Sequence, residues 1–497
     1  MKQEASSTAR YQPIDRAQLF LRTVDVEALI PKDHLARNIW DLLGGVDLSH
    51  FSAGIKSVVG SAGRNAWEPR LLISIWIYAY SRGIHSAREI ERQCAYEPAL
   101  QWLTGFQVVN HHTLSDFRTA HGEALRELFV EVVGVMKAHG LVKLARVMQD
   151  GTKVRANANK KSFAKADKLA EGLRQAREQL AALEEAIRQE AAEHAQAAKL
   201  RTAKQREQLL AAAVDEVARL QSQKRWDKDK PCQASGTDPD CQFMKNGDGG
   251  LAPGYNVQLV TDAANGLVVG VGVSKRPTDE EELEPALEQL KQDFGEDPKQ
   301  VVVDSGYTNA ATVAAVSERG VDLIGSWHER GAKRPNHGID PAYASSHFHY
   351  DADHNEMICP EGKRLQQRTK RKLSEWVQVI TYRGRQSDCS SCQKRMLCSP
   401  KNAMTKHGRA VTRRIVHETV TAFKQKMQTE EAKQIYKQRA PVAEFPNAWI
   451  KTKLNFTRFR CRGLEKATAE ATWAALTFNL QRLFKLMPEW RTALAVG

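Results

Sequence analysis

The chain has 497 residues, of which 42% are apolar and 27% are charged, the ordinary balance of a globular protein with a large buried core. No apolar run approaches the roughly 20 residues that span a bilayer, and the first residues lack the apolar stretch of a signal peptide, so we expect a cytoplasmic protein without a membrane partner. The net charge of +14 favours a polyanionic partner, most simply nucleic acid, although a basic surface kept for solubility gives the same composition.

Residues 33–139 are predicted to be helical. Within them, SAREIERQC and HHTLSDFRTAHG, with the turn between, have the pattern of a helix-turn-helix, and an ordinary helical bundle fits equally well. Ser86 and Thr113 are the expected caps, and His111 and Arg118 are expected on exposed faces. We take residues 1–140 as a helical N-terminal domain and hypothesise that it binds DNA.

A short apolar strand is predicted from about Leu144 to Met148, ending at Asp150. From about Ala164 the composition changes to Ala, Leu, Glu, Gln, Lys and Arg, with apolar residues seven apart for about two heptads. This coiled-coil-like pattern predicts a helical insertion over residues 160–230, either a protruding hairpin or one long helix.

The next segments predict further sheet and helices. The runs around Asn265 and Gly266 predict a β-hairpin, TDEEELEPALEQLKQDFG a helix, QVVVD a buried strand ending at Asp304, and GVDLIGSW another strand after a further helix. Together they predict a mixed α/β sheet. Residues 330–410 are expected to be irregular, and the chain from about Val411 to Leu486 helical.

Asp150 and Asp304 are each expected at the carboxyl end of a strand, where ligand sites of α/β sheets lie. If the first and fourth strands are neighbours, the two carboxylates converge, and a hard cation such as Mg²⁺ would relieve their repulsion. The alternative for Asp304 is a helix cap, and for Asp150 a turn with Gly151.

Four stretches carry a family resemblance. VMQDGTKVRANA, PGYNVQLVTDAANGLVV, VVVDSGYTNAATVAAVSERGVDLIG and the C-terminal YKQRAPVAEFPNAWIKTKLNFTRFRCRGLEKATAEATWAALTFNLQRL together resemble a bacterial insertion-sequence transposase of the DDE class. The resemblance extends from about Asp33 to the end of the chain. It implies a ribonuclease-H-like catalytic domain over residues 141–497, interrupted by the helical insertion and by the irregular segment 330–410.

The resemblance also implies the chemistry: Mg²⁺-dependent cleavage and strand transfer of DNA, with two Asp and one Glu holding two Mg²⁺ or Mn²⁺ ions. Asp150 and Asp304 match the first two carboxylates. The third, Glu444, belongs to a run of Tyr, Arg, Glu and Lys that has one residue more than usual between Arg and Glu. Pro441 predicts a helix break near Ala440 that absorbs this residue.

The resemblance further implies double-stranded DNA partners, both terminal inverted repeats and target DNA, a homodimer on DNA and a nucleoid-associated location. A basic stretch follows Glu444, with Phe456 and Phe459 interleaved, which favours DNA lying alongside. The predicted DNA-binding residues are Tyr436, Arg439, Lys451, Lys453, Arg458, Arg460 and Arg462.

Four of the eight cysteines lie in the segment expected to be irregular. Cys359, Cys389, Cys392 and Cys398 have the spacing C-x29-C-x2-C-x5-C, which fits a structural Zn²⁺ site, and unligated reduced thiols fit equally well. In a chain this long the cysteines do not make a disulfide scaffold.

Two other functions share the predicted fold. One is a metal-dependent nuclease that only cuts, and the other is a decayed or domesticated transposase that only binds DNA. The presence of all three acidic positions favours an active enzyme.

Overall fold

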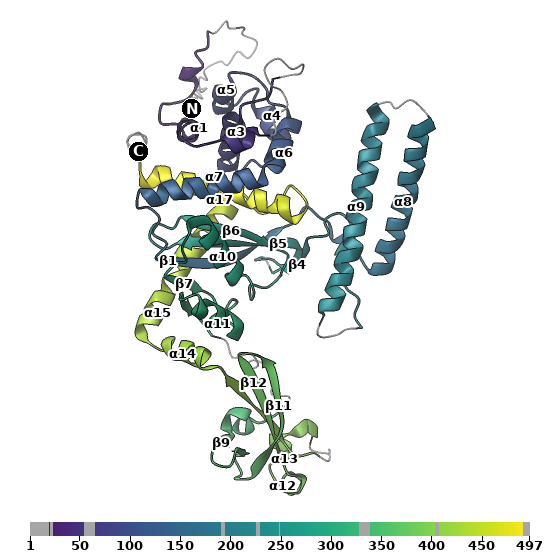
Figure 1. The fold of residues 1–497 in the computed structure, drawn as a ribbon, viewed down its shortest axis with the longest axis vertical. Coiled ribbons are helices and arrows are strands. Elements are labelled where there is room, and N and C mark those ends of the chain that lie inside the picture. The colour runs from purple at the N-terminus through teal and green to yellow at the C-terminus, as the bar shows by residue number, and fades with distance from the viewer. Residues whose placement is uncertain are drawn as a thin grey trace, which may run out of the picture.

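The structure is a computed structural model that describes Leu19 and residues 23–53, 65–189, 194–224, 229–247, 249–327, 338–402 and 407–490. These residues form a helical N-terminal region, an α/β unit with a projecting helical hairpin, and a small β-rich region at the opposite end (Figure 1). None of the helices in those ranges combines the length and apolar character needed to cross a membrane.

The N-terminal region is helical, as predicted. Its helices are α1 Leu35–Leu43, α2 Ser49–Ser52, α3 Pro69–Ser81, α4 Ala87–Gln93, α5 Pro98–Thr104, α6 His111–Ala120 and α7 Gly122–Ala138, after a 3-10 turn η1 at Glu27–Leu29. Helix α3 is buried along almost its whole length because its sequence is apolar on every face.

Three local predictions for this region were wrong. A helix, α5, occupies the stretch expected to be a turn between α4 and α6. Ser86 caps α4 as predicted, but α6 is capped by Asn110, and Thr113 lies inside the helix. Arg118 is only 5% exposed, and its buried guanidinium donates to the carbonyl of His85.

The central sheet has the order β4–β5–β1–β7–β8, and β6 also pairs with β5. Its strands are β1 Arg146–Arg155, β4 Gln242–Lys245, β5 Leu251–Asp262, β6 Val268–Ser274, β7 Gln300–Val303 and β8 Asp322–Gly325. Strand β5 is antiparallel to β1 and β6, whereas β1, β7 and β8 run parallel. This mixed sheet, with helices on its faces, confirms the predicted α/β, ribonuclease-H-like fold.

Strand β7 reads as an unbroken apolar run because helices cover both faces of the sheet. Val301 and Val303 join the large core with residues of α10 (Leu283–Phe294) and α11 (Ala310–Glu318). Val302 faces the other way and packs with Ala432 and Ala443 of the C-terminal helices.

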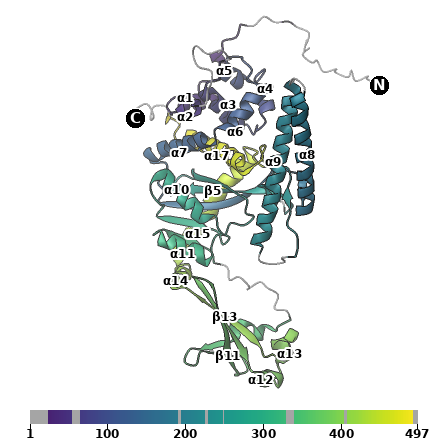
Figure 2. The ribbon, with the colours of Figure 1, turned by 45° about the vertical axis from the view of Figure 1, so that its right-hand side comes forward.

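The helical insertion is a hairpin. Helices α8 (Ala166–Gln189) and α9 (His194–Gln223) pack against each other beside the α/β unit (Figure 2). At the base lie η2 (Lys160–Ser162) and a two-stranded pair, β2 Phe163–Ala164 with β3 Ala234–Ser235.

The segment expected to be irregular is instead rich in strands. Residues 338–416, which we call the cysteine module, contain the sheet β13–β12–β11–β10–β9. Its elements are η3 Pro341–Tyr343, η4 Ser345–His347, β9 His349–Asp351, β10 Glu356–Ile358, β11 Arg364–Ser374, β12 Val377–Gly384, α12 Gln386–Ser390, α13 Arg395–Cys398, η5 Pro400–Asn402 and β13 Ala410–Val416. The predicted helical stretch from Val411 therefore begins later, at Glu418.

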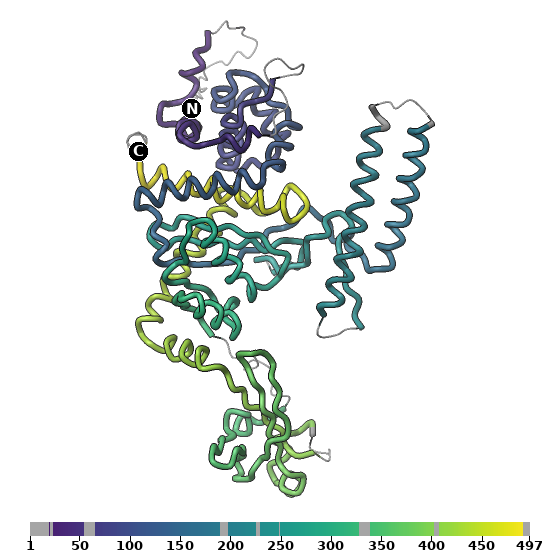
Figure 3. Tube along the Cα trace, in the orientation of Figure 1, coloured from purple at the N-terminus to yellow at the C-terminus, as the bar shows by residue number. Residues whose placement is uncertain are grey.

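The C-terminal helices return to the sheet and to the N-terminal region. They are α14 Glu418–Lys426, α15 Glu430–Lys437, the π-helix η6 Ala440–Glu444, α16 Phe445–Thr452 and α17 Leu464–Leu486. Helix α17 packs against β6, α3 and α7, so it lies between the sheet and the N-terminal helices (Figure 3). One continuous apolar core, from Ile30 to Trp490, therefore joins the two regions, and we call them together the main unit.

Candidate active site

Asp150 and Asp304 lie on neighbouring parallel strands. Strands β1 and β7 pair as far as Met148 opposite Val302, so two further residues along this register bring Asp150 opposite Asp304. The prediction that strand β1 ends at Asp150 was wrong. The strand continues to Arg155 because β5 pairs with it on the other side. Only the parallel pairing with β7 ends there, which opens the sheet at the two carboxylates.

The alternatives for both aspartates do not hold. Helix α11 is capped by Asn309, whose side chain accepts from the Thr312 backbone N–H, so Asp304 is not its cap. The Asp304 carboxylate instead accepts from the Gly306 N–H at 2.7 Å. Asp150 lies inside β1 and is therefore not part of a hairpin turn.

The Asp150 side chain is largely buried and has two polar partners from the C-terminal helices. Arg439 Nη1 lies 3.5 Å from Asp150 Oδ1, and Asn447 Nδ2 donates to Oδ2 at 3.0 Å. Burial raises the pKa of Asp150 to about 6; the Arg439 charge opposes this rise, and the charges of Asp304 and Glu444 add to it. The three predicted carboxylates thus interact electrostatically at Asp150.

Glu444 reaches this region through a π-helical turn rather than through the predicted break. The backbone keeps helical torsion angles across Arg439, Glu444 and Phe445, and η6 between them is a π-helix, whose turn holds more residues than an α turn. Arg439 and Glu444, five apart, consequently face each other and bond at 3.2 Å. The extra residue of the motif is absorbed where Pro441 cannot continue the α-helical hydrogen-bond ladder.

The Glu444 side chain is 57% exposed, in contrast to Asp150 at 18%. The two other acidic residues nearby lie in the first turn of α15. Glu430 accepts a hydrogen bond from Gln434 within that helix, and Glu431 is exposed. Of these three glutamates, Glu444 shares its partner Arg439 with Asp150.

A fourth carboxylate, Asp279, was missed by the sequence analysis. Asp279 Oδ1 accepts from Lys153, Asn256 and Gln258 at 3.0, 2.7 and 2.8 Å. A Cβ at Gly151 would lie 2.5 Å from that oxygen, so only glycine allows this close packing after Asp150. The loop sequence before α10 gives no sign of this role for Asp279, because its partners lie on β1 and β5, far away in the chain.

A Cβ at Gly306 would lie 2.9 Å from Asp304 Oδ1 and 3.7 Å from Asp279 Oδ2. The Asp279 carboxylate therefore lies beside the Asp304 turn. Tyr307 is buried next to them, and burial together with the charges of Asp279, Asp150 and Asp304 raises its pKa. Asn447 was also missed, although it follows Glu444 by three residues and so could have been assigned to a neighbouring helical position.

The predicted DNA-binding residues divide into two groups. Tyr436 packs against the small core under the sheet, and Arg439 is 13% exposed and held by the carboxylates, so neither presents an open surface. Lys451 is half-buried near Asp150 and Lys153, and burial lowers its pKa. The exposed members are Lys453, Arg458, Arg460 and Arg462.

Phe456 and Phe459 do not interleave with the exposed basic side chains. They are 1% and 0% exposed and belong to the main core, which corrects the prediction that they lie along DNA. Their burial fixes the loop beside the end of β1, where Phe459 N–H donates to the carbonyl of Arg155. Arg458, the basic residue between them, is exposed.

Two surface hollows lie at this loop. Arg458 and Arg462 line one together with Asn157, Lys160 and the start of β5. Arg460 lines the other together with the first turns of α4 and α6, including Arg88, His111 and His112. His111, expected on an exposed face, is half-buried and pairs with Glu91 at 2.6 Å.

Two family models match segments of the chain. One, described as a transposase DDE domain, matches residues 358–484, and the other, described as a transposase domain, matches residues 24–120. Over these two segments the chain is similar to transposases. The matched segments include Glu444 and the basic loop, whereas Asp150 and Asp304 lie outside them and rest on the strand register.

No protein of curated function matches the chain. Among solved structures, the cryo-EM structure of the piggyBac transposase synaptic complex with hairpin DNA matches at 9% identity and a TM-score of 0.24, covering 92% of this chain and 81% of that chain. A likeness this loose carries no argument, and the fold assignment rests on the sheet order given above.

DDE transposase domains use divalent metal ions. The site offers hard oxygen donors, including the buried Asn447 Oδ1, which has no hydrogen-bond partner among the described residues. Within those same residues, no three His, Cys, Asp or Glu side chains are grouped closely enough to hold a metal ion as they stand. Arg439 pairs with two of the carboxylates, Asp150 and Glu444.

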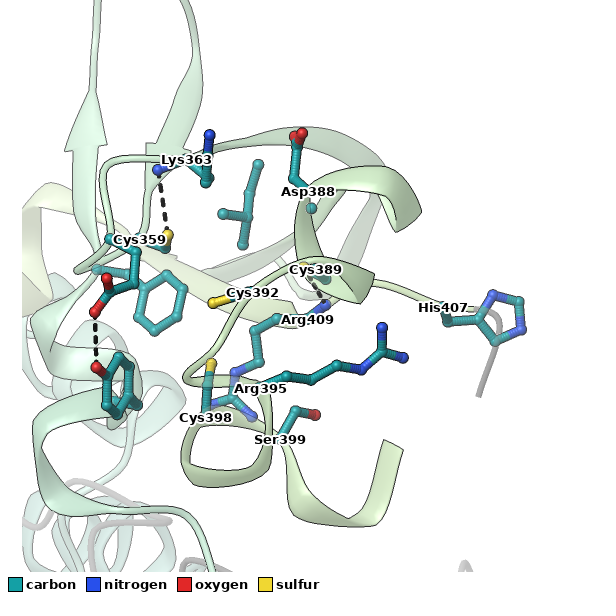
Figure 4. Close-up of a pocket in the computed structure, with 15 residues that line it drawn as sticks. Cys359, Lys363, Asp388, Cys389, Cys392, Arg395, Cys398, Ser399, His407 and Arg409 are labelled. Carbon is teal, nitrogen blue, oxygen red and sulfur yellow. Dashed lines mark hydrogen bonds between the residues drawn. The ribbon is translucent and has the colours of Figure 1, made fainter. Parts of the chain in front are cut away.

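The four cysteines of the cysteine module line one cavity (Figure 4). This cavity does not include any residue of the central sheet. All eight cysteines are free thiols.

Proposed function

We propose that the chain is a transposase that binds the ends of an insertion sequence and catalyses metal-dependent DNA cleavage and strand transfer at Asp150, Asp304 and Glu444. The observation that carries the proposal is the strand register, which aligns Asp150 with Asp304 where β1 and β7 part. Two carboxylates that converge where neighbouring strands part repel each other unless a cation binds between them. The catalytic unit would be residues 141–497, with the insertions 160–230 and 330–410.

The ions would be two Mg²⁺ or Mn²⁺, held by the three carboxylates, with the Asn447 side-chain oxygen available as a further donor. When bound, such ions activate the attacking oxygen and stabilise the leaving oxygen of a phosphodiester. Arg439 neutralises Asp150 and Glu444 in the metal-free site and would turn toward a DNA phosphate as the carboxylates take their ligands.

DNA would run from the carboxylates across the basic loop to the N-terminal helices. Lys451 approaches Asp150, and Arg460 lines a hollow with Arg88 and α6. This shared hollow supports a joint role of residues 1–140 and of Lys453, Arg458, Arg460 and Arg462 in contacting double-stranded DNA, both terminal inverted repeats and target. We further propose a homodimer on DNA and an association with the nucleoid.

The test is cleavage of a DNA end taken from the inverted repeats that flank the gene. Asp150→Asn and Asp304→Asn should each lower Mg²⁺-dependent cleavage by about a thousandfold or more, while binding to the same DNA falls little. Near wild-type cleavage by either variant would contradict the assignment. Cleavage without joining to target DNA in the wild type would identify a nuclease, and binding alone would identify a decayed transposase.

The third carboxylate has its own matched comparison. Glu444→Gln should abolish cleavage, whereas Glu430→Gln and Glu431→Gln should retain it, because those side chains belong to the first turn of α15. Lys451→Ala should mainly weaken DNA binding and lower the salt dependence by about one phosphate contact. Loss of cleavage in Glu431→Gln with full activity in Glu444→Gln would move the third carboxylate to Glu431.

A further inference from the structure

The cysteine module has few apolar residues with which to hold its fold. Its described core consists of Phe348, Met357, Leu365, Ile380, Tyr382 and Val411. Strand β11 contributes one buried side chain, and the rest of that strand is mostly polar and mostly exposed. A region with so little apolar burial usually needs a disulfide or a metal to hold it.

Four thiols converge on one cavity at the end of this sheet. Cys359 follows β10, Cys389 lies in α12, Cys392 follows that helix, and Cys398 ends α13. The hairpin of β11 and β12 closes the 29-residue gap between Cys359 and Cys389. Figure 4 shows the sulfurs of Cys392 and Cys398 directed toward the space that they share with Cys359.

Hydrogen-bond donors and cationic side chains lie around the thiols. The backbone N–H of Lys363 donates to Cys359 Sγ at 3.3 Å, and that of Arg409 donates to Cys389 Sγ at 3.4 Å. The guanidiniums of Arg395 and Arg409 also line the cavity, and the buried Arg409 Nε has no hydrogen-bond partner among the described residues. Backbone donors and cations of this kind stabilise thiolates.

Two glycines let the backbone pack closely beside Cys389. A Cβ at Gly384 would lie 3.0 Å from Cys389 Sγ, and one at Gly408 would lie 2.1 Å from the Gly384 carbonyl oxygen.

We propose that Cys359, Cys389, Cys392 and Cys398 bind one structural Zn²⁺ that holds the cysteine module together. Four thiols lose their protons as they bind, and the resulting four-sulfur, tetrahedral complex carries two negative charges next to Arg395 and Arg409. The sulfurs are not yet grouped closely enough to hold the ion, so binding turns these side chains into the shared cavity. The inference is independent of the proposed catalysis, because none of these residues belongs to the sheet that carries Asp150.

Soft sulfur donors select Zn²⁺ over Mg²⁺, and every cysteine of the chain is a free thiol, so the cavity is not closed by a disulfide. Iron is the competing metal for four cysteines.

The experiment is elemental analysis of the full chain, purified under reducing conditions with zinc in the medium. The wild type should contain about one zinc per chain, and Cys389→Ser/Cys392→Ser should contain at least about fivefold less. The matched control is Cys232→Ser, which removes a half-buried cysteine outside the module and should keep the zinc. A wild type that holds no zinc, or holds iron, overturns the proposal, as does a double variant that keeps its zinc.

A second measurement on the wild type covers the case in which the double variant fails to fold. After chelation, titration with Co²⁺ should give the visible bands of tetrahedral cobalt and a sulfur-to-cobalt charge-transfer band, both saturating near one equivalent and displaced by Zn²⁺. Octahedral cobalt spectra, or no saturation near one equivalent, would overturn the site.

Discussion

The main unit and the cysteine module bury apolar side chains to very different extents. The main unit shares one core from Ile30 to Trp490, in which α17 contributes along nearly its whole length. The cysteine module relies on the six described core residues and four thiols at the end of a mostly exposed sheet. A large core gives cooperative stability, whereas a small one depends on a local cross-link.

The difference also shows where charge can be tolerated. In the main unit, Arg118 and Glu470 are 5% and 0% exposed, and Glu470 also accepts from the backbone N–H groups of Arg460 and Cys461. In the cysteine module, the ion pairs of Arg364 with Asp351 and Glu356 are at the surface. Burial makes the first pair costly to break, and solvent makes the second pairs weak.

The largest effect on stability is expected from Arg118→Ala. Removing this guanidinium leaves Glu470 buried with only backbone donors, which should lower the free energy of unfolding by about 3–5 kcal/mol. Chemical denaturation of the full chain measures it. The double variant Arg118→Met/Glu470→Met should recover part of the loss, and equal loss in both variants would mean that packing, not the unpaired charge, is responsible.

A matched pair of leucines compares the two regions directly. Leu476→Ala in α17 should lower the main unfolding transition by roughly 2–5 kcal/mol, because a cavity forms in the shared core. Leu365→Ala in the module should leave that transition almost unchanged and speed proteolysis within residues 338–416. If Leu365→Ala lowers the main transition as much as Leu476→Ala, the two regions unfold as one.

Acid should weaken the main unit through His85. Burial lowers the pKa of His85 to about 4, and the charges of Arg460 and Arg118 add to this. In the unfolded chain His85 binds a proton below about pH 6.5, whereas in the folded chain it binds one only near pH 4. The stability present above pH 6.5 is therefore lost as the pH falls from 6.5 to 4, and the loss approaches about 3 kcal/mol.

The measurement is the free energy of unfolding of the wild type and of His85→Gln between pH 7 and pH 4.5. The variant should lose less stability across this range, because glutamine does not titrate. Parallel curves for the two proteins would show that His85 does not carry the acid response.

The smallest effect is expected from Arg364→Ala in the module. The Arg364 side chain is 50% exposed, so solvent screens its ion pairs with Asp351 and Glu356, and the thermal unfolding midpoint should not change measurably. A clear drop would mean that the surface charges hold the module, and would weaken the case for a metal.

The fold of the main unit was largely predictable because its elements carry local signals. The Asn265–Gly266 turn, the apolar run before Asp304 and the apolar α3 each match one periodicity, and the structure has the corresponding hairpin, strand and buried helix. The cysteine module was missed because β11, with its run of basic residues, lacks the apolar alternation that marks a half-buried strand.

Residue placement was predictable where one chain segment carried the signal and not where partners came from elsewhere. Asp150 and Asp304 were expected close together because each follows an apolar run, and the strand register aligns them; their catalytic role stays a prediction. Arg118 was expected on the surface and Phe456 on DNA, because a single helix or loop does not reveal that α17 and the sheet cover them.

The sequence by itself determined the order of most strands and helices of the main unit, the family resemblance and the placing of Asp150 and Asp304 on neighbouring strands, since these depend on neighbouring residues and on motif spacing. Tertiary structure alone decided that Asp279 joins the Asp304 turn, that a π turn carries Glu444, and that four cysteines share one cavity. These features depend on contacts between residues far apart in the chain, and their free energies arise only when the sheet and helices have packed.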